Sequence, residues 1–369
     1  ANDPPRYNSV FGRAGLLAFI LAAIGVFFRT PLLALFIGII DPGKMVADSA
    51  SLYFTICVWG IPPLLMTLSI NGWFIGMQNT VAPMCISISM NLFNVVASIC
   101  AVYVFKAGFA GVAYGTLIAN WTGLCLAIAI VIFTSRRYKL KILSLKEIIA
   151  GGFGKFFRVS SDLFLRSACI MSVSMAVTAI GARMGDLTMA VNTIMVQFFL
   201  FFSYFMDGFS FAGEALVGKH AGASKLPEVY DVTKQLMKWS AAMAIAFMLI
   251  YLFGASLIAT LITDVENVRE GINKMRVFIW ILPPIAVWAF IYDGVFIGLT
   301  ATRRMFLTTF VATLLFASVI AIGWHFYPFS AHPSTGNRIL WSAFLGFLAV
   351  RGIGLALQFK TAVKHYHVT

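Results

Sequence analysis

One pattern occurs twice in this chain, in the segments 59–76 and 280–298. Each segment carries a Trp, then a Pro-Pro pair, then a polar residue followed by Gly, and it ends with Phe-Ile-Gly. The polar residue is Asn71 in the first copy and Asp293 in the second. A weak internal repeat inside a hydrophobic chain is typical of membrane transport folds, in which two halves share one plan.

The composition requires a lipid environment. Hydrophobic residues make up 60% of the chain and charged residues only 11%, whereas soluble domains carry about 25% charged residues. A surface covered by so few charges cannot face water, so we expect an all-α polytopic membrane protein. The net charge of +13 reflects basic residues gathered in particular loops, which indicates membrane topology and gives no reason to expect a nucleic-acid partner.

Segments long enough to span a bilayer, about 20 residues each, can be counted between turn and charge signals. We predict ten spans in the sequence: roughly 14–38, 52–76, 83–105, 109–134, 160–181, 187–216, 236–262, 277–299, 304–326 and 338–359.

The basic segment 135–159 is the natural linker between two helical lobes. It divides the chain into an incomplete N-terminal lobe, 1–134, and a C-terminal lobe, 160–369, and within it residues 146–156 are suited to a short amphipathic surface helix. If this linker is cytoplasmic, the loops alternate in charge and most Lys and Arg fall on its side. The positive-inside rule then predicts that both ends of this chain are cytoplasmic.

The repeat also predicts that the complete protein is longer. Three spans precede the Pro-Pro pair in the second half and only one precedes it in the first, and the segment 222–227 resembles the segment 1–5. We therefore expect two further spans before Ala1, for twelve helices in two pseudo-symmetric lobes. These lobes would be related by an axis along the membrane normal.

Three acidic residues lie inside predicted spans. They are Asp207 and Glu214 in 187–216 and Asp293 in 277–299. An ionised carboxylate in a bilayer costs at least about 2.5–3.5 kcal/mol, so such residues are functional candidates. Asp207 and Glu214 are seven residues apart and share one helix face. We predict ion coupling or substrate binding for all three, against the alternative that they are structural and that Glu214 is a solvated helix end.

Other polar residues in the spans are weaker candidates for the same roles. Arg166 follows Asp162 by one helical turn and is suited to pair with a buried acid, or to reach the interface instead. Asn71, Asn91, Asn94 and Gln197 lie near mid-span, where amides often only bond to neighbouring helices. Asn91 and Asn94 are three residues apart and share a face, which favours a cavity lining.

Enzyme chemistry has little support in the sequence. The chain has no P-loop, no G-x-S-x-G and no H-E-x-x-H. Its five Cys lie in apolar runs without metal-ligand spacing, so we expect free thiols, no metal site and no cofactor. Without an ATP site, pumping requires an ion gradient. A membrane-embedded enzyme would need clustered catalytic His, Ser/Lys or paired Asp residues, and Asp207 and Asp293 could form such a pair only if they met across the second lobe.

Several segments resemble the MATE (multidrug and toxic compound extrusion) family, and in particular its DinF branch. The strongest runs Tyr-Phe-Met-Asp-Gly-Phe-Ser-Phe-Ala-Gly-Glu-Ala-Leu-Val-Gly over 204–218, and others cover 72–79, 162–166, 197–200 and 293–298. The resemblance implies a bacterial inner-membrane antiporter that exports organic, often cationic, compounds in exchange for protons or sodium. It implies that two six-helix lobes rock around a central cavity. It places Asp293 on an acidic position tied to cation coupling and Asn94 on a family Asn.

The resemblance has departures and rivals. The family's first-helix Asp would lie before Ala1, and Ser98 stands where some proton-coupled members have Asp. A lipid-linked-sugar flippase of the same superfamily is one alternative, although flippase cavities are usually cationic and the charges noted above lean acidic. A non-transporting truncated fragment is another. For the antiporter we expect a monomer whose partners are small organic substrates and membrane lipids.

Overall fold

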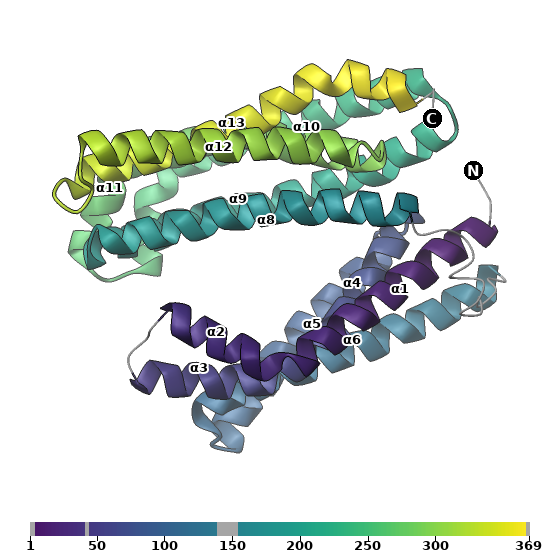
Figure 1. Ribbon diagram of the computed structural model, residues 1–369, viewed down its shortest axis with the longest axis horizontal. Coiled ribbons are helices and arrows are strands. Elements are labelled where there is room, and N and C mark those ends of the chain that lie inside the picture. The colour runs from purple at the N-terminus through teal and green to yellow at the C-terminus, as the bar shows by residue number, and fades with distance from the viewer. Residues whose placement is uncertain (1–3, 41–43, 139–153, 367–369) are drawn as a thin grey trace. The chain divides into compact units, whose positions relative to one another are not determined.

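The computed structural model describes residues 4–40, 44–138 and 154–366, and every element assigned within them is helical (Figure 1). The chain divides into two compact units, Asn2–Phe153 and Gly154–Thr369, called here the first and second units. An all-helical build follows from the composition, since a helix satisfies its own backbone hydrogen bonds in lipid.

Ten helical segments of the described chain are long and apolar enough to cross a membrane, which confirms the all-α membrane fold. They are Val10–Phe27, Ala47–Gly76, Val81–Val104, Gly108–Ser135, Phe157–Arg183, Asp186–Gly222, Leu226–Ile262, Glu266–Gly298, Thr302–Phe326 and Pro333–Lys364.

The first predicted span, 14–38, is wrong as a single helix. The structure has α1 (Pro4–Phe27) and α2 (Arg29–Ile40), with the break at Phe28. Pro31 explains the position of the break. A proline has no N–H for the carbonyl four residues earlier and its ring clashes with that carbonyl, which here belongs to Phe27, the last residue of α1.

The first unit continues through α3 (Lys44–Cys57), the 3₁₀ turn η1 (Val58–Gly60) and α4 (Ile61–Gly76). Then come α5 (Val81–Ile99), which ends in a π-helical turn, η2 (Cys100–Val104), and α6 (Gly108–Tyr138). Its core lies where α4, α5 and α6 meet. The buried side chains of this core are Ile70, Trp73, Phe74, Ala82, Ile86, Leu124 and Ala127.

The second unit consists of α8 (Gly154–Arg183), α9 (Asp186–Gly222), α10 (Leu226–Ile262), α11 (Glu266–Gly298), α12 (Thr302–Phe326) and α13 (Pro333–Tyr366). α11 packs against α9, α10 and α13, while α8 lies along α12 (Figure 1). α11 is therefore the central helix of this unit, and a polar side chain on it is surrounded by neighbours.

The structure describes only part of the predicted linker 135–159. α6 extends to Tyr138 and α8 begins at Gly154, so both helices enter the predicted linker 135–159. The remaining linker residues, with most of the predicted surface helix 146–156, lie outside the described residues.

Candidate functional site

The second unit holds a charged cluster formed by three helices. Asp293 comes from α11, Arg166 from α8 and Arg351 from α13. The Oδ2 atom of Asp293 accepts a hydrogen bond from Arg351 Nη2 at 2.6 Å and a second from Arg166 Nη2. The side chains of Asp293 and Arg351 are each 8% exposed and that of Arg166 is 14% exposed. The predicted intramembrane acid thus lies in the packed interior of its unit.

Glycines next to Arg351 and Asp293 bring α13 and α9 close to α11. A Cβ added at Gly352 would stand 2.6 Å from Trp288 Cβ and 2.8 Å from the Ala289 nitrogen, so only glycine lets α13 approach α11 beside Arg351. A Cβ added at Gly294 would overlap the backbone of Ser210 on α9. The small residues that flank Arg351 and Asp293 therefore determine the tight packing in which the cluster forms.

The cluster leaves several polar atoms without partners. Both arginines donate to the same oxygen of Asp293, and its Oδ1 atom is buried with no hydrogen-bond partner. The Nε atoms of Arg166 and Arg351 are also buried and unpaired. Two positive groups face one negative group, so the cluster as a triad carries an excess positive charge.

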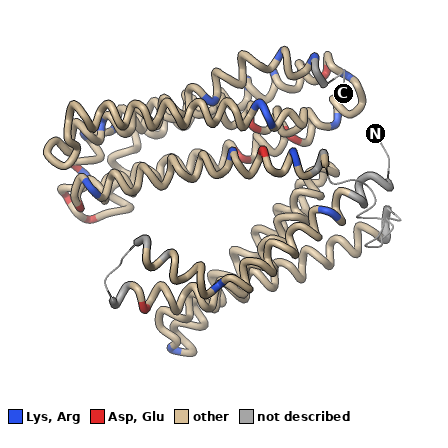
Figure 2. The backbone as a smooth tube through the Cα atoms, in the orientation of Figure 1, with Lys and Arg blue, Asp and Glu red and all other residues tan. Residues whose placement is uncertain are grey.

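The other two predicted acids lie on α9. Asp207 and Glu214 are partly exposed, and within the described part of the chain neither forms an ion pair. Asp207 is close enough to Asp293 for their charges to interact. Most other charged residues lie toward helix ends (Figure 2), so these two carboxylates are unusual in being within a span and unpaired.

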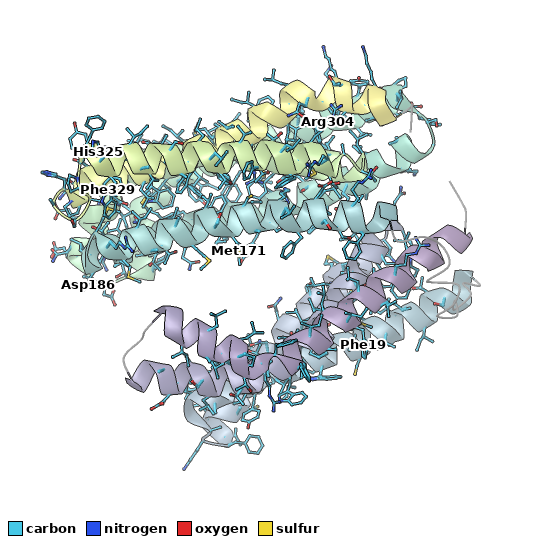
Figure 3. All side chains as sticks on the ribbon, in the orientation of Figure 1. Phe19, Met171, Asp186, Arg304, His325 and Phe329 are labelled. Atoms are coloured by element: carbon cyan, nitrogen blue, oxygen red, sulfur yellow. The ribbon has the colours of Figure 1, made fainter. Side chains whose placement is uncertain are left out.

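Arg166 pairs with an acid, as one prediction held, but that acid is not Asp162. Asp162 is 4% exposed and accepts hydrogen bonds from Thr302 Oγ1 and Arg303 Nη1, each at 3.3 Å. α8 therefore directs Arg166 into the unit and exposes apolar side chains elsewhere. Met171, 64% exposed, projects from α8 on the side away from α12 (Figure 3).

The first unit contains a separate polar pocket of about 240 Å³, called here the amide pocket. It is lined by Leu64, Thr67, Leu68, Asn71, Ser87, Met90, Asn91, Asn94, Ala119 and Asn120. Three predicted residues, Asn71, Asn91 and Asn94, thus share one cavity formed by α4, α5 and α6. The lining carries four carboxamides and no charged side chain, so the pocket is suited to hydrogen bonding.

Hydrogen bonds within the amide pocket are unevenly satisfied. Asn91 donates to the Ser87 carbonyl at 2.9 Å, and Asn94 contacts Thr116 Oγ1 and Ser98 Oγ at 3.4 Å each. The oxygens of Asn71 and Thr67 are buried without a partner. The pocket therefore contains two acceptors whose hydrogen-bonding capacity is unused among the described residues.

Sequence reasoning missed two site residues. Arg351 lies inside the predicted span 338–359, and the rule that flags intramembrane charges would have found it. Asn120 lies inside the span 109–134 and carried no stronger signal than any amide. Gln197, which was predicted, is exposed on α9 and makes no hydrogen bond among the described residues, so it joins neither the charged cluster nor the pocket.

Ten membrane-length helical segments in the described chain, two compact units and polar groups inside the spans are typical of membrane transporters. The MatE family model matches residues 6–100 and 163–322, and the chain belongs to this family. Members of the family are transporters, so this is a transport protein and not an enzyme.

Relatives of known sequence support this membership. "DNA damage-inducible protein F" of Escherichia coli K12 is 30% identical over 360 residues, which cover 96% of this chain and 76% of that protein. "Protein DETOXIFICATION 45, chloroplastic" of Arabidopsis thaliana is 28% identical over 245 residues, which cover 65% of this chain and 42% of that protein. The family predicted from the segments around Asp207 and Asp293 is confirmed.

Solved structures support the fold. The eukaryotic MATE transporter AtDTX14 superposes with a TM-score of 0.82 at 15% identity, covering 98% of this chain and 80% of that one. The Vibrio cholerae MATE transporter VcmN in its bent form gives a TM-score of 0.75 at 16% identity, covering 99% and 85%. The predicted MATE-type helical architecture is therefore confirmed. Two further spans before Ala1 stay a prediction.

Proposed function

We propose that this transporter is a secondary antiporter that exports organic cationic or amphipathic compounds across a bacterial inner membrane in exchange for protons or sodium. The observation that carries the proposal is that two carboxylates, Asp207 and Glu214, lie within a span of a MatE-family chain and form no ion pair among the described residues. Relatives named for detoxification support export as its direction.

Asp207 and Glu214 are better placed than Asp293 to hold a cation. Asp293 already receives hydrogen bonds from two arginines, so a cation approaching it meets two like charges. The carboxylates on α9 have no such competitors among the described residues. An unpaired carboxylate inside a membrane is costly and gains most from binding a proton, a sodium ion or a cationic substrate. We assign the coupling role to these two residues.

The amide pocket supports a role in substrate binding. Asn71, Asn91 and Asn94 offer both donors and acceptors, and no charge in the lining selects against either sign of ligand. Uncharged amides bind a polar group by hydrogen bonds of modest strength, which suits a compound that must be released again. We assign these residues to the polar groups of the exported compound.

The test is gradient-driven transport of a fluorescent organic cation in proteoliposomes, with a proton or sodium gradient imposed separately. Asp207→Asn and Glu214→Gln should each slow transport at least about tenfold, because each removes a charged partner of the ion or substrate. Asp186→Asn is the matched control, since it removes an exposed acid from the first turn of the same helix. Normal transport by both span variants would refute the coupling assignment.

A lipid-linked-sugar flippase is the second candidate, favoured by one specific observation. Arg166 and Arg351 bring two buried cations into the second unit, and Arg is well suited to bind phosphate groups. Proteoliposomes offered either the organic cation or a lipid-linked sugar separate the two functions, because only the antiporter moves the organic cation in exchange for protons or sodium.

A further inference from the structure

The charged cluster has more positive than negative charge in a buried place. Arg166 and Arg351 both point at Asp293, and the three side chains are between 8% and 14% exposed. A buried charge is normally paired, because an uncompensated one is expensive to remove from water. One carboxylate compensates only one of the two guanidinium groups, so the triad is one negative charge short.

The unused hydrogen-bonding groups of the cluster point to a ligand. Each arginine donates a hydrogen bond from one terminal nitrogen to Asp293 Oδ2, and both Nε atoms are buried without an acceptor. Arg351 is 7% exposed as a residue, so water does not satisfy it from bulk. Buried polar groups are hydrogen-bonded in the great majority of cases, which makes two orphaned Nε donors an incomplete binding site.

The geometry of the arginines also favours a planar anion. The guanidinium of Arg351 lies over the ring of Phe347, with its central carbon 5.2 Å from the ring centroid. Phe347 is 1% exposed and is therefore a fixed part of the core. A guanidinium held this way presents its planar fork of donors in one orientation, which matches the two oxygens of a carboxylate. Arg166 is the most exposed of the three side chains, at 14%.

We propose that Arg166 and Arg351 form a binding site for the carboxylate group of an organic ligand, and that Asp293 is its built-in competitor. Asp293 occupies the arginines when the ligand is absent, and a ligand carboxylate takes over the guanidinium donors when it binds. Asp293 stays within the cluster after the exchange, so two carboxylates then balance the two guanidinium groups. It gives the transporter a way to hold an acidic or zwitterionic compound beside the carboxylates of α9.

Charge balance selects a monocarboxylate over phosphate. A single negative charge neutralises the excess charge of the triad. A phosphate carries about −1.5 to −2 at neutral pH and would leave the cluster negative. The inference thus deepens the proposed transport function by naming an acidic group in the substrate, but binding itself requires no gradient.

The experiment measures binding to the purified protein in detergent without any ion gradient. The probes are a fluorescent aromatic monocarboxylate, its neutral primary amide and inorganic phosphate. The carboxylate should bind at least about tenfold more tightly than the amide. Arg166→Gln and Arg351→Gln should abolish this difference. Arg303→Gln should preserve it, since Arg303 is 64% exposed and pairs with Asp162.

Asp293→Asn gives the decisive result. Removal of the competitor should tighten carboxylate binding about tenfold, because the ligand no longer displaces a charge-assisted hydrogen bond. Weaker or unchanged binding would overturn the proposal, as would equal binding of the amide or of phosphate. If a glutamine variant fails to fold, Arg351→Lys keeps the charge and removes the planar fork, and it should still lower affinity about tenfold with an intact thermal transition.

Failure of this binding test and failure of the proposed antiport are distinguishable. Carboxylate binding in detergent reports only on the charged cluster. Transport of the organic cation in proteoliposomes reports on Asp207 and Glu214. A protein that exports the cation yet shows no preference for the carboxylate probe would retain the antiporter function and lose the anion site.

Discussion

The two copies of the repeat differ most in the surroundings of their equivalent polar residues, Asp293 and Asn71. Asp293 is 6% exposed and held by two arginines in a tightly packed unit. Asn71 lines an open pocket, and its side-chain oxygen has no partner. The same helix position thus carries a charge where neighbouring helices supply counter-charges and a neutral amide where they do not. A charged side chain inside a membrane is tolerated where neighbouring helices supply a counter-charge.

The glycines that follow these residues show the same contrast. A Cβ at Gly294 would overlap Ser210 and one at Gly298 would stand 2.8 Å from the Glu214 carbonyl oxygen, so α11 and α9 are in backbone contact. At Gly72 and Gly76 a Cβ would meet nothing within 4 Å among the described residues. The helix α9 packs against the glycine pair Gly294 and Gly298, whereas no described residue packs against the pair Gly72 and Gly76.

The Pro-Pro pairs also act differently in their two settings. Pro283 and Pro284 lie inside the continuous helix α11, whereas Pro62 follows the 3₁₀ turn η1 at the start of α4. The residue two positions before the first proline of each pair is Gly60 in one copy and Ile281 in the other. Glycine adds about 1 kcal/mol to the cost of a helix there, which favours the interruption.

The largest expected difference between the two copies comes from removing the polar residue of each. Asp293→Ala leaves two buried arginines facing each other and should lower the free energy of unfolding by about 3–5 kcal/mol. Asn71→Ala removes an amide from a pocket and should cost about 1 kcal/mol or less. Denaturant unfolding in mixed micelles measures both. Equal losses would mean that the two positions do not differ in the way described.

A smaller effect is expected at the glycine after each of these residues. Gly294→Ala forces α9 away from α11 and should destabilise the protein by about 1–3 kcal/mol. Gly72→Ala meets open space and should be neutral or stabilise by about 0.5–1 kcal/mol through helix propensity. The same unfolding assay decides. A destabilising Gly72→Ala would indicate that a further helix covers this face of α4.

The smallest effect is expected before the Pro-Pro pairs. Ile281→Gly should cost about 1 kcal/mol through helix propensity, because Ile281 is 42% exposed and loses little burial. Gly60→Ala should change stability by less than about 1 kcal/mol, since the propensity gain is offset by displacement of the Asn120 amide, 2.8 Å from the added Cβ. A larger change in the free energy of unfolding for either variant, or a change of the opposite sign, would show that Gly60 does not cause the helix interruption before Pro62.

Some of the site was readable from residues alone, because single residues carry the physics involved. A carboxylate in an apolar run is conspicuous wherever it lies, so Asp207, Glu214 and Asp293 could be found without a structure. Asn91 and Asn94 could be paired because three residues of helix place them on one face, and both line the amide pocket. Arg351 was within reach of the same rule and was overlooked.

The partners of these residues were not readable in the same way. Asp162 lies one turn from Arg166 on the same helix, yet each residue pairs with a residue of a different helix. Asn120 gained its place only because α6 packs against α4 and α5. The break at Phe28 was missed because hydropathy sees one apolar run where Pro31 interrupts the hydrogen bonds.

The sequence by itself determined the membrane environment, the ten apolar spans and the duplicated plan, because composition and periodicity act along the chain. The tertiary structure alone decided which charges meet. Arg166, Asp293 and Arg351 are far apart in sequence and come together only in the packed unit, where Gly352 lets α13, the helix of Arg351, approach α11 closely. Counter-charge is a property of neighbours in space, and only the packed helices supply it.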